Sequence, residues 1–112
     1  MSLKQELFDR ISKHLLKQNA KSIGIGGCRY RGDNGLKCAV GAIISDKRYS
    51  EKIEETNVYN QEVADCLPVR YQGRGSIEFL AKLQKLHDQL PVDLWKQRLE
   101  EIAKDENLVV NF

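Results

Sequence analysis

The sequence predicts a mainly helical α+β fold in which helices pack around a small antiparallel β-hairpin. Apolar residues recur with helical spacing near both ends of the chain, and an Asn-Gly pair near its middle is typical of a tight hairpin turn. The chain has 112 residues, which suits a single domain over residues 1–112. A chain of this length buries a modest core without help from a disulfide or a metal.

The first predicted element is a helix over residues 3–18, with Asn19 as its C-terminal stop. Residues 22–27 then read Ser-Ile-Gly-Ile-Gly-Gly, and three glycines in four positions suit neither a helix nor a strand interior. We therefore predict a loop there. The apolar stripe of the helix consists of Leu3, Leu7, Phe8, Ile11, Leu15 and Leu16.

The predicted hairpin pairs residues 28–31 with residues 36–38 through a turn at 32–35. The Asn-Gly pair of this turn favours the positive φ angles that a tight hairpin needs. Two strands alone are only marginally stable, so the hairpin must lean on a helix or gain a third strand. The β-prone residues 108–112 are the candidate for that strand.

Residues 38–44 are continuously apolar, so a strand and a buried helix compete for them. We favour a short buried helix that ends near Ser45 and Asp46. On such a helix the small residues at 38, 41 and 42 form a flat face that lets another backbone approach closely. The larger residues that then face the core are Val40, Ile43 and Ile44.

The second half of the chain predicts three further helices. A short helix over residues 60–67 is stopped by Pro68, whose ring cannot continue a helix. A long helix runs from Ser76, its expected N-cap, to about Leu90. A proline-containing connection leads to a last helix over residues 92–104, and its shortness predicts a near-antiparallel pair.

Two segments of the chain predict less regular structure. Residues 46–55 are charged and predict either a short helix or an ordered loop. Residues 71–75 contain two glycines and one arginine, and they predict an exposed, basic and mobile loop.

Composition narrows the class of protein. The net charge is +2, from 18 basic and 16 acidic residues, so composition gives no support to a dedicated nucleic-acid binder. Three cysteines, an odd number, follow a start that lacks the apolar region of a signal peptide. No apolar run approaches the ~20 residues of a membrane span. We therefore expect free thiols, a cytoplasmic location and no membrane contact.

One motif resembles a pattern in small uncharacterised proteins of phages and bacterial genomes. It comprises residues 28–32, residues 35–46 and Tyr49, and the pattern reads Cys-x-Tyr-Arg, a turn with Gly, Lys-Cys-Ala-Val-Gly, apolar residues, Asp and Tyr. The resemblance implies a phage-type origin and a size class, and no mechanism. Ser45 stands where Pro is frequent, and Ala42 where Cys is frequent. The C-terminal half is similar at residues 83–88, Trp95, Leu99, Ile102 and Ala103.

The sharpest catalytic hypothesis is a cysteine nucleophile. Cys38 would open a buried helix, whose amides lower a thiol pKa, and Lys37 adds positive charge. His87 would act as base, oriented by Asp88 or Asp46. The competing interpretation, which we favour, makes Cys38 a small buried hydrophobe and His87 a core histidine.

Metal and anion sites are the other candidates. The possible metal ligands lack the short spacing of structural sites, so we expect neither a metal nor a cofactor. Arg29 and Arg31 alternate on one strand face beside a glycine-rich segment, and Arg74, with Arg70, would extend an anion-binding patch. The alternative is a solvated hairpin face with Tyr30 packed inward. The possible metal ligands are Cys28, Cys38, Cys66, His14 and His87.

The leading functional hypothesis is a small non-enzymatic accessory protein that binds another protein or associates with itself. It depends on a compact helical domain, near-neutral charge and the lack of a convincing catalytic set. A thiol-dependent hydrolase or transferase that uses Cys38 and His87 is the alternative. A weaker alternative is phosphate, nucleotide or nucleic-acid binding through Arg29, Arg31 and Arg74.

Overall fold

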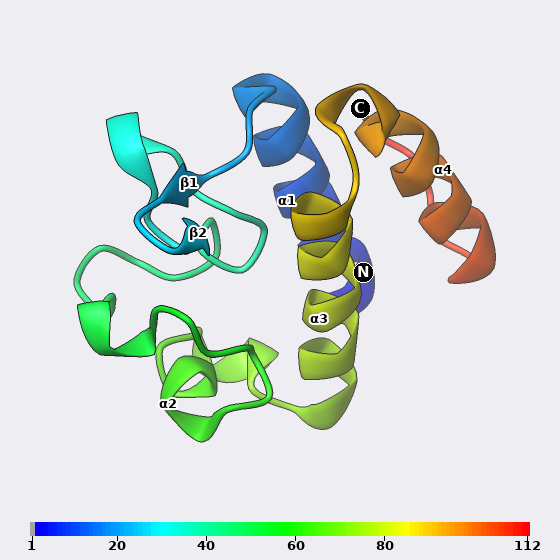
Figure 1. The fold of residues 1–112 in the computed structure, drawn as a ribbon. Coiled ribbons are helices and arrows are strands. Elements are labelled where there is room, and N and C mark those ends of the chain that lie inside the picture. Colours follow the sequence, from blue (N-terminus) through cyan, green and yellow to red (C-terminus); the bar gives the residue numbers. More distant parts are fainter. Residues whose placement is uncertain (1) are drawn as a thin grey trace.

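A computed structural model describes residues 2–112 and confirms the mainly helical α+β fold. Figure 1 shows α1 and α3 side by side, α4 on the outer side of α3, and the short β-hairpin with the irregular middle of the chain on the opposite side. The elements are α1 (Leu3–Gln18), β1 (Ile23–Gly24), β2 (Gly27–Cys28), α2 (Gln61–Ala64), α3 (Arg74–Gln89) and α4 (Trp95–Asp105).

The predicted first helix is confirmed as α1. The Ser2 hydroxyl accepts a hydrogen bond from the backbone N–H of Gln5, which satisfies one of the free donors of the first turn. The helix ends at Asn19, whose φ of 51° lies in the left-handed region typical of a helix stop. The side chains of its apolar stripe that are completely buried are Leu7, Phe8, Ile11 and Leu15.

The hairpin lies earlier in the chain than predicted. The glycine-rich segment that predicted a loop forms the ladder, in which Ile23 pairs with Cys28 and Gly24 with Gly27. The predicted strands at 28–31 and 36–38 are reduced to one isolated bridge, between Arg31 and Lys37. The Asn-Gly turn does reverse the chain, since Asn34 and Gly35 have φ angles of 61° and 76°.

A buried carboxylate explains why the predicted ladder does not form. Glu54 accepts the backbone N–H groups of Tyr30 and Arg31, at 2.9 and 3.1 Å. These donors are therefore used by a side chain from residues 51–55, which contain the 3₁₀ turn Glu51–Ile53. The sequence predicted either a short helix or an ordered loop for this part of the chain. A local pattern cannot reveal a competing acceptor that lies more than twenty residues away.

The predicted third strand at 108–112 is wrong. Gln5 takes the place of a strand partner, because its side-chain amide donates to the carbonyl of Val109 and accepts the N–H of Val109, both at 2.9 Å. The tail is held further by Phe112, whose ring centroid lies 6.1 Å from that of Phe8. The C-terminal segment therefore packs on α1 without joining the sheet.

The apolar segment 38–44 is buried, as predicted, but it is not a regular helix. Its turns close through Ala42 N–H to the Cys38 carbonyl and Ile43 N–H to the Val40 carbonyl, both at 3.0 Å. The expected close approach occurs at Gly41, where a Cβ would overlap the carbonyl oxygen of Tyr30. Only glycine fits this contact, because the neighbouring atoms are backbone.

The predicted exposed loop at 71–75 is only partly right: Gln72 and Gly73 are irregular and residues 73–75 are exposed, but both ends of the segment are helical. Tyr71 ends a 3₁₀ turn (Val69–Tyr71), is completely buried, and donates from its hydroxyl to Glu6 at 3.0 Å. α3 starts at Arg74 with Gly73 as its N-cap, so Ser76, the expected N-cap, lies inside the first turn. Tyr71 therefore belongs to the core, and the irregular part of the segment is limited to Gln72 and Gly73.

The last two helices follow the prediction. α3 ends before Leu90, and a turn over Val92–Leu94 leads into α4, which runs back along α3 in the opposite sense (Figure 1). α4 buries Trp95, Leu99 and Ile102 against the core. Of the helix predicted over residues 60–67, only Gln61–Ala64 is α-helical, as α2. Across residues 2–112, none of the helices is long and apolar enough to cross a membrane.

Candidate functional site

Cys38, the predicted nucleophile, lies inside the core with 1% of its surface exposed. Its Sγ accepts a hydrogen bond from the backbone N–H of Gly41 at 3.3 Å. Burial raises the pKa of the thiol to about 12, and the contacts with the Gly41 amide and the Gln84 side chain offset only part of that effect. The thiol is therefore protonated and shielded at neutral pH, which is the opposite of an activated nucleophile.

His87, the predicted base, is completely buried on α3. The structure brings Asp88 beside it, with Nδ1 of His87 at 2.7 Å from Oδ1 of Asp88. The other ring nitrogen, Nε2, accepts the backbone N–H of Ser22 at 3.0 Å. Within residues 2–112 no hydrogen bond joins His87 to Cys38. Because Nε2 already accepts a hydrogen bond from Ser22 and Nδ1 donates to Asp88, the ring has no free lone pair with which to deprotonate a thiol.

Cys28, which the sequence analysis considered only as a metal ligand, lies closer to this pair. The ligand atoms of Cys28, His87 and Asp88 are all within 4.8 Å of one another. Burial, followed by the charge of Asp88, raises the pKa of the Cys28 thiol. A metal here would need both a thiolate and a free imidazole nitrogen, and the hydrogen bonds of His87 engage both of its nitrogens. The cluster is therefore arranged as a hydrogen-bonded support for the hairpin.

Arg29 and Arg31, the predicted anion ligands, are used inside the fold. One terminal nitrogen of Arg29 lies 3.0 and 2.9 Å from the two carboxylate oxygens of Glu51. Arg31 donates to the carbonyl oxygens of Gly41 and Ile44, at 2.6 and 2.8 Å. Both guanidinium groups therefore tie the hairpin to the middle of the chain.

Glu54 is the centre of this internal network. Besides the two backbone N–H groups described above, its carboxylate accepts the hydroxyl of Tyr49 at 2.6 Å. The Arg29 guanidinium lies 3.8 Å away, and the Tyr30 ring packs inward with 6% exposure while its hydroxyl donates to the Thr56 carbonyl. The Cys-x-Tyr-Arg motif thus has a structural role in this chain.

Arg74 lies apart from the other two arginines. It stands in the first turn of α3, its side chain is 93% exposed, and its only ion pair among the described residues is with Glu78 one turn later. No contact joins it to Arg29 or Arg31, so the structure does not assemble the predicted three-arginine patch.

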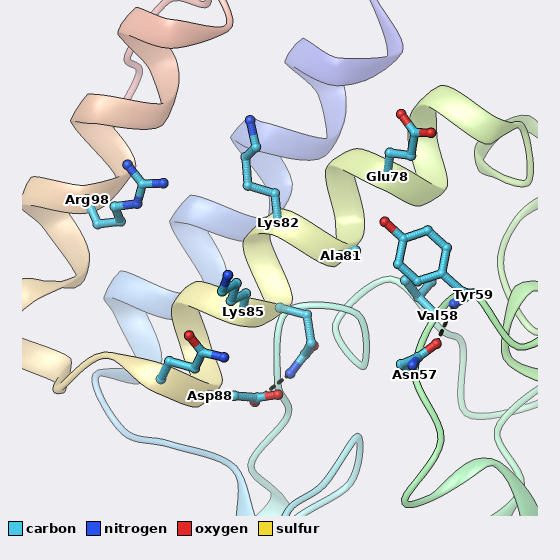
Figure 2. Close-up of a pocket in the computed structure, with 11 residues that line it drawn as sticks. Asn57, Val58, Tyr59, Glu78, Ala81, Lys82, Lys85, Asp88 and Arg98 are labelled. Carbon is cyan, nitrogen blue, oxygen red and sulfur yellow. Dashed lines mark hydrogen bonds between the residues drawn. The ribbon is translucent and has the colours of Figure 1, made fainter.

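A groove opens between the outer face of α3, α4 and residues 57–59, and Asp88 of the cluster described above forms part of its lining. It has a volume of about 570 Å³, and Figure 2 shows its lining. Tyr59, 63% exposed, stands at one side, where its backbone N–H donates to the Asn57 side chain at 3.0 Å. We call this hollow the α3 groove. Its lining residues are Asn57, Val58, Tyr59, Glu78, Ala81, Lys82, Gln84, Lys85, Asp88, Gln89 and Arg98.

The groove leads into a smaller hollow of about 180 Å³ between α3 and α4, which we call the cationic pocket. Lys82 forms an ion pair with Glu106 at 2.9 Å, and Arg98 forms one with Glu101 at 3.3 Å. Lys85 is exposed and has no ion pair within residues 2–112. Figure 2 shows Arg98 extending from α4 toward the two lysines of α3. The pocket is lined by Lys82, Lys85, Leu86, Gln89, Leu90 and Arg98.

Neither hollow was predicted from the sequence. Lys82, Lys85 and Gln89 recur at helical spacing and mark the outer face of the predicted long helix, which is the one signal the sequence contains. Arg98 and Tyr59 come from other elements, so only the packing of α4 and the middle segment brings them together.

No family model, curated protein or solved structure matches this chain.

Proposed function

We propose that this protein is a non-enzymatic binding module that docks another protein in the α3 groove. The observation that supports the proposal most directly is a contrast in how side chains are used. The groups suited to catalysis or anion binding are consumed by internal hydrogen bonds, as at Cys38, His87 and Arg31. The groove instead presents an exposed tyrosine and cations that the core does not need.

The lining suits a protein ligand. Tyr59 and Arg98 belong to the residue types that carry most binding energy at interfaces, because each combines apolar area with a polar end. The lysine stems of α3 add apolar surface beside Ala81 and Val58 while their ammonium groups stay in water. A groove with both features accepts a peptide segment or the edge of a folded partner.

A plugged groove tests the proposal. Ala81 lines the groove, so Ala81→Trp fills it, and Val69→Trp places the same side chain at a residue that is 75% exposed and outside the lining. Each variant, and the natural chain, is used as bait in an extract of cells that encode the protein. We expect a discrete partner that the natural chain and Val69→Trp capture and Ala81→Trp loses.

A second groove variant separates docking from folding. Tyr59→Ala removes exposed surface without touching the core, so it should fold normally and weaken capture by about tenfold. Circular dichroism of every variant checks the fold. Equal capture by all variants, or a strict monomer that captures nothing, would count against the proposal. The phage-type origin that the motif indicates stays a prediction.

A further inference from the structure

We infer that the segment bound in the α3 groove is acidic, and that one of its carboxylates is held in the cationic pocket by Lys82, Lys85 and Arg98. This inference rests on the proposed function and names the chemistry of the partner. It identifies a recognition site from three side chains on two helices that the core does not require.

The composition of the pocket points to an anion. Three cations line it, Gln89 adds an amide, and no carboxylate does. Its volume of about 180 Å³ has room for a side-chain carboxylate with a few water molecules, each of which takes up about 30 Å³. Arg98 contributes a planar donor group that can hold both oxygens of a carboxylate.

The charges of the pocket are only partly balanced within the chain. Lys82 shares Glu106 with Lys4, and Arg98 faces Glu101 on its own helix. The Arg98–Glu101 pair is exposed on both sides and therefore weak, so it exchanges readily for an incoming carboxylate. The Lys82–Glu106 pair is more shielded, because the Glu106 side chain is 17% exposed. Lys85 has no such partner in the described part of the chain, which leaves its ammonium available.

The acidic residues of the larger groove are not part of the lining of the cationic pocket. The Asp88 carboxylate is held by His87 and by the Gln84 side chain, at 2.7 and 2.8 Å. Glu78 lies toward the other end of the groove in Figure 2 and faces Arg74 at 3.5 Å. A bound segment therefore meets positive charge where α3 and α4 approach and an aromatic ring at Tyr59.

The surroundings favour an acidic protein segment over a nucleic acid. Leu86 and Leu90 form part of the pocket lining, and a protein side chain brings the apolar surface that can cover them. The net charge of the chain is only +2, whereas a phosphodiester backbone is usually bound by a broad basic surface. Three cations around one small pocket match a single carboxylate.

A designed peptide provides the direct test. The probe is a peptide of about ten residues that mixes Glu with a few Leu, and its control has Gln in place of every Glu. Titration of the full chain, followed by amide NMR shifts, should show salt-sensitive binding of the Glu peptide only, with shifts centred on Lys85 and Arg98. The double variant Lys85→Glu/Arg98→Glu should weaken binding by at least about tenfold.

Matched controls keep the result interpretable. Lys13→Glu reverses an exposed charge on α1 outside both hollows and should leave peptide binding unchanged. Lys85→Gln removes charge without creating repulsion, and it keeps the test valid if the double variant folds poorly. Binding of the Gln peptide as tightly as the Glu peptide, or tighter binding of an oligonucleotide of equal charge, would overturn the inference.

The inference and the proposed function can fail separately. If a natural partner is lost in Ala81→Trp but kept in Lys85→Glu/Arg98→Glu and at about 0.5 M salt, the groove docks a partner by other contacts. In that case the inference that the bound segment is acidic is wrong, and the proposal that the protein is a binding module is kept. If Ala81→Trp and Tyr59→Ala both leave capture unchanged, the proposed function itself is wrong.

Discussion

The Nε2 atom of His87 accepts the backbone N–H of Ser22 at 3.0 Å, and this bond joins α3 to the start of the hairpin inside the core. Both residues are completely buried. The bond determines which ring nitrogen carries the proton, because Nε2 is an acceptor and Nδ1 is left to donate to Asp88. A residue that resembled a catalytic base thereby becomes a connection between two elements.

Replacing this histidine should destabilise the fold. In His87→Phe the ring volume is nearly kept, but the Ser22 N–H loses its acceptor in a site without water access. We expect the free energy of unfolding to fall by about 1–3 kcal/mol, measured by urea denaturation. Asp88→Asn keeps an oxygen for Nδ1 and should cost clearly less. An equal loss in both variants would place the effect at Asp88.

Glu54 should be the most sensitive carboxylate of the chain. Glu54→Gln removes one of two oxygens that together accept Tyr30 N–H, Arg31 N–H and the Tyr49 hydroxyl. We expect a loss of about 2 kcal/mol in urea denaturation, the size of a hydrogen bond to a charged group. Glu55→Gln is the matched control, since Glu55 is exposed, and it should change stability little.

Gly41 and Gly75 should respond oppositely to alanine. A Cβ at Gly41 overlaps the Tyr30 carbonyl, so the backbone must shift, and we expect Gly41→Ala to lower stability by at least about 2 kcal/mol. Gly75 lies in the first turn of α3 with open space around it, so Gly75→Ala should raise stability by about 0.5–1 kcal/mol. Thermal denaturation measures both. Tolerance at Gly41 would contradict the close approach.

Stability should fall with acid partly because of His14. Desolvation by burial lowers the pKa of His14 from 6.5, although the hydrogen bond to the Lys37 carbonyl opposes the shift. The unfolded chain therefore binds a proton at a higher pH than the folded chain does. The contribution of His14 to the free energy of unfolding is intact above pH 6.5, and it is lost as the pH falls through the pKa that His14 has in the folded protein.

The matched variant for this pH dependence is His14→Gln, which keeps a side-chain donor for Lys37 and cannot titrate. Unfolding free energies measured between pH 7.5 and pH 5 should decline less steeply in His14→Gln than in the natural chain. Parallel curves would show that His14 does not contribute to the acid sensitivity.

The thiols of Cys38 and Cys28 should differ in reactivity. Cys38 is buried and its pKa is raised to about 12, so iodoacetamide should leave it unmodified until the protein unfolds. Cys28 is exposed, but burial of its sulfur and the Asp88 charge raise its pKa, so it should react more slowly than a free thiol. Mass spectrometry of the digested protein measures each site. Rapid modification of Cys38 in the folded protein would revive the nucleophile hypothesis.

Much of the helical frame was predictable because its signals are local. The apolar stripe and stop of α1 and the apolar stripes of α3 and α4 each follow from spacing within one element, although α3 starts at Arg74, before its expected N-cap Ser76. The hairpin was not predictable in its register. Its donors at Tyr30 and Arg31 are used by Glu54, and its tail partner at Val109 is used by Gln5.

The candidate sites show the same limit. The chemical types of Cys38, His87, Arg29 and Arg31 made them candidates, but a side chain's neighbours decide whether its lone pairs and charges remain available. The α3 groove was missed for the converse reason. Lysines on an exposed helix face are common, and these become notable only when Arg98 approaches from α4.

The amino-acid sequence alone determined the three long helices α1, α3 and α4, the burial of residues 38–44 and the return of the chain at Asn34 and Gly35, because short-range spacing and backbone preference act within a few residues. The tertiary structure alone decided which donors meet which acceptors, so it turned His87 and Glu54 into structural centres and opened a groove elsewhere. Hydrogen bonds and ion pairs between distant residues depend on position in space, which no local pattern records.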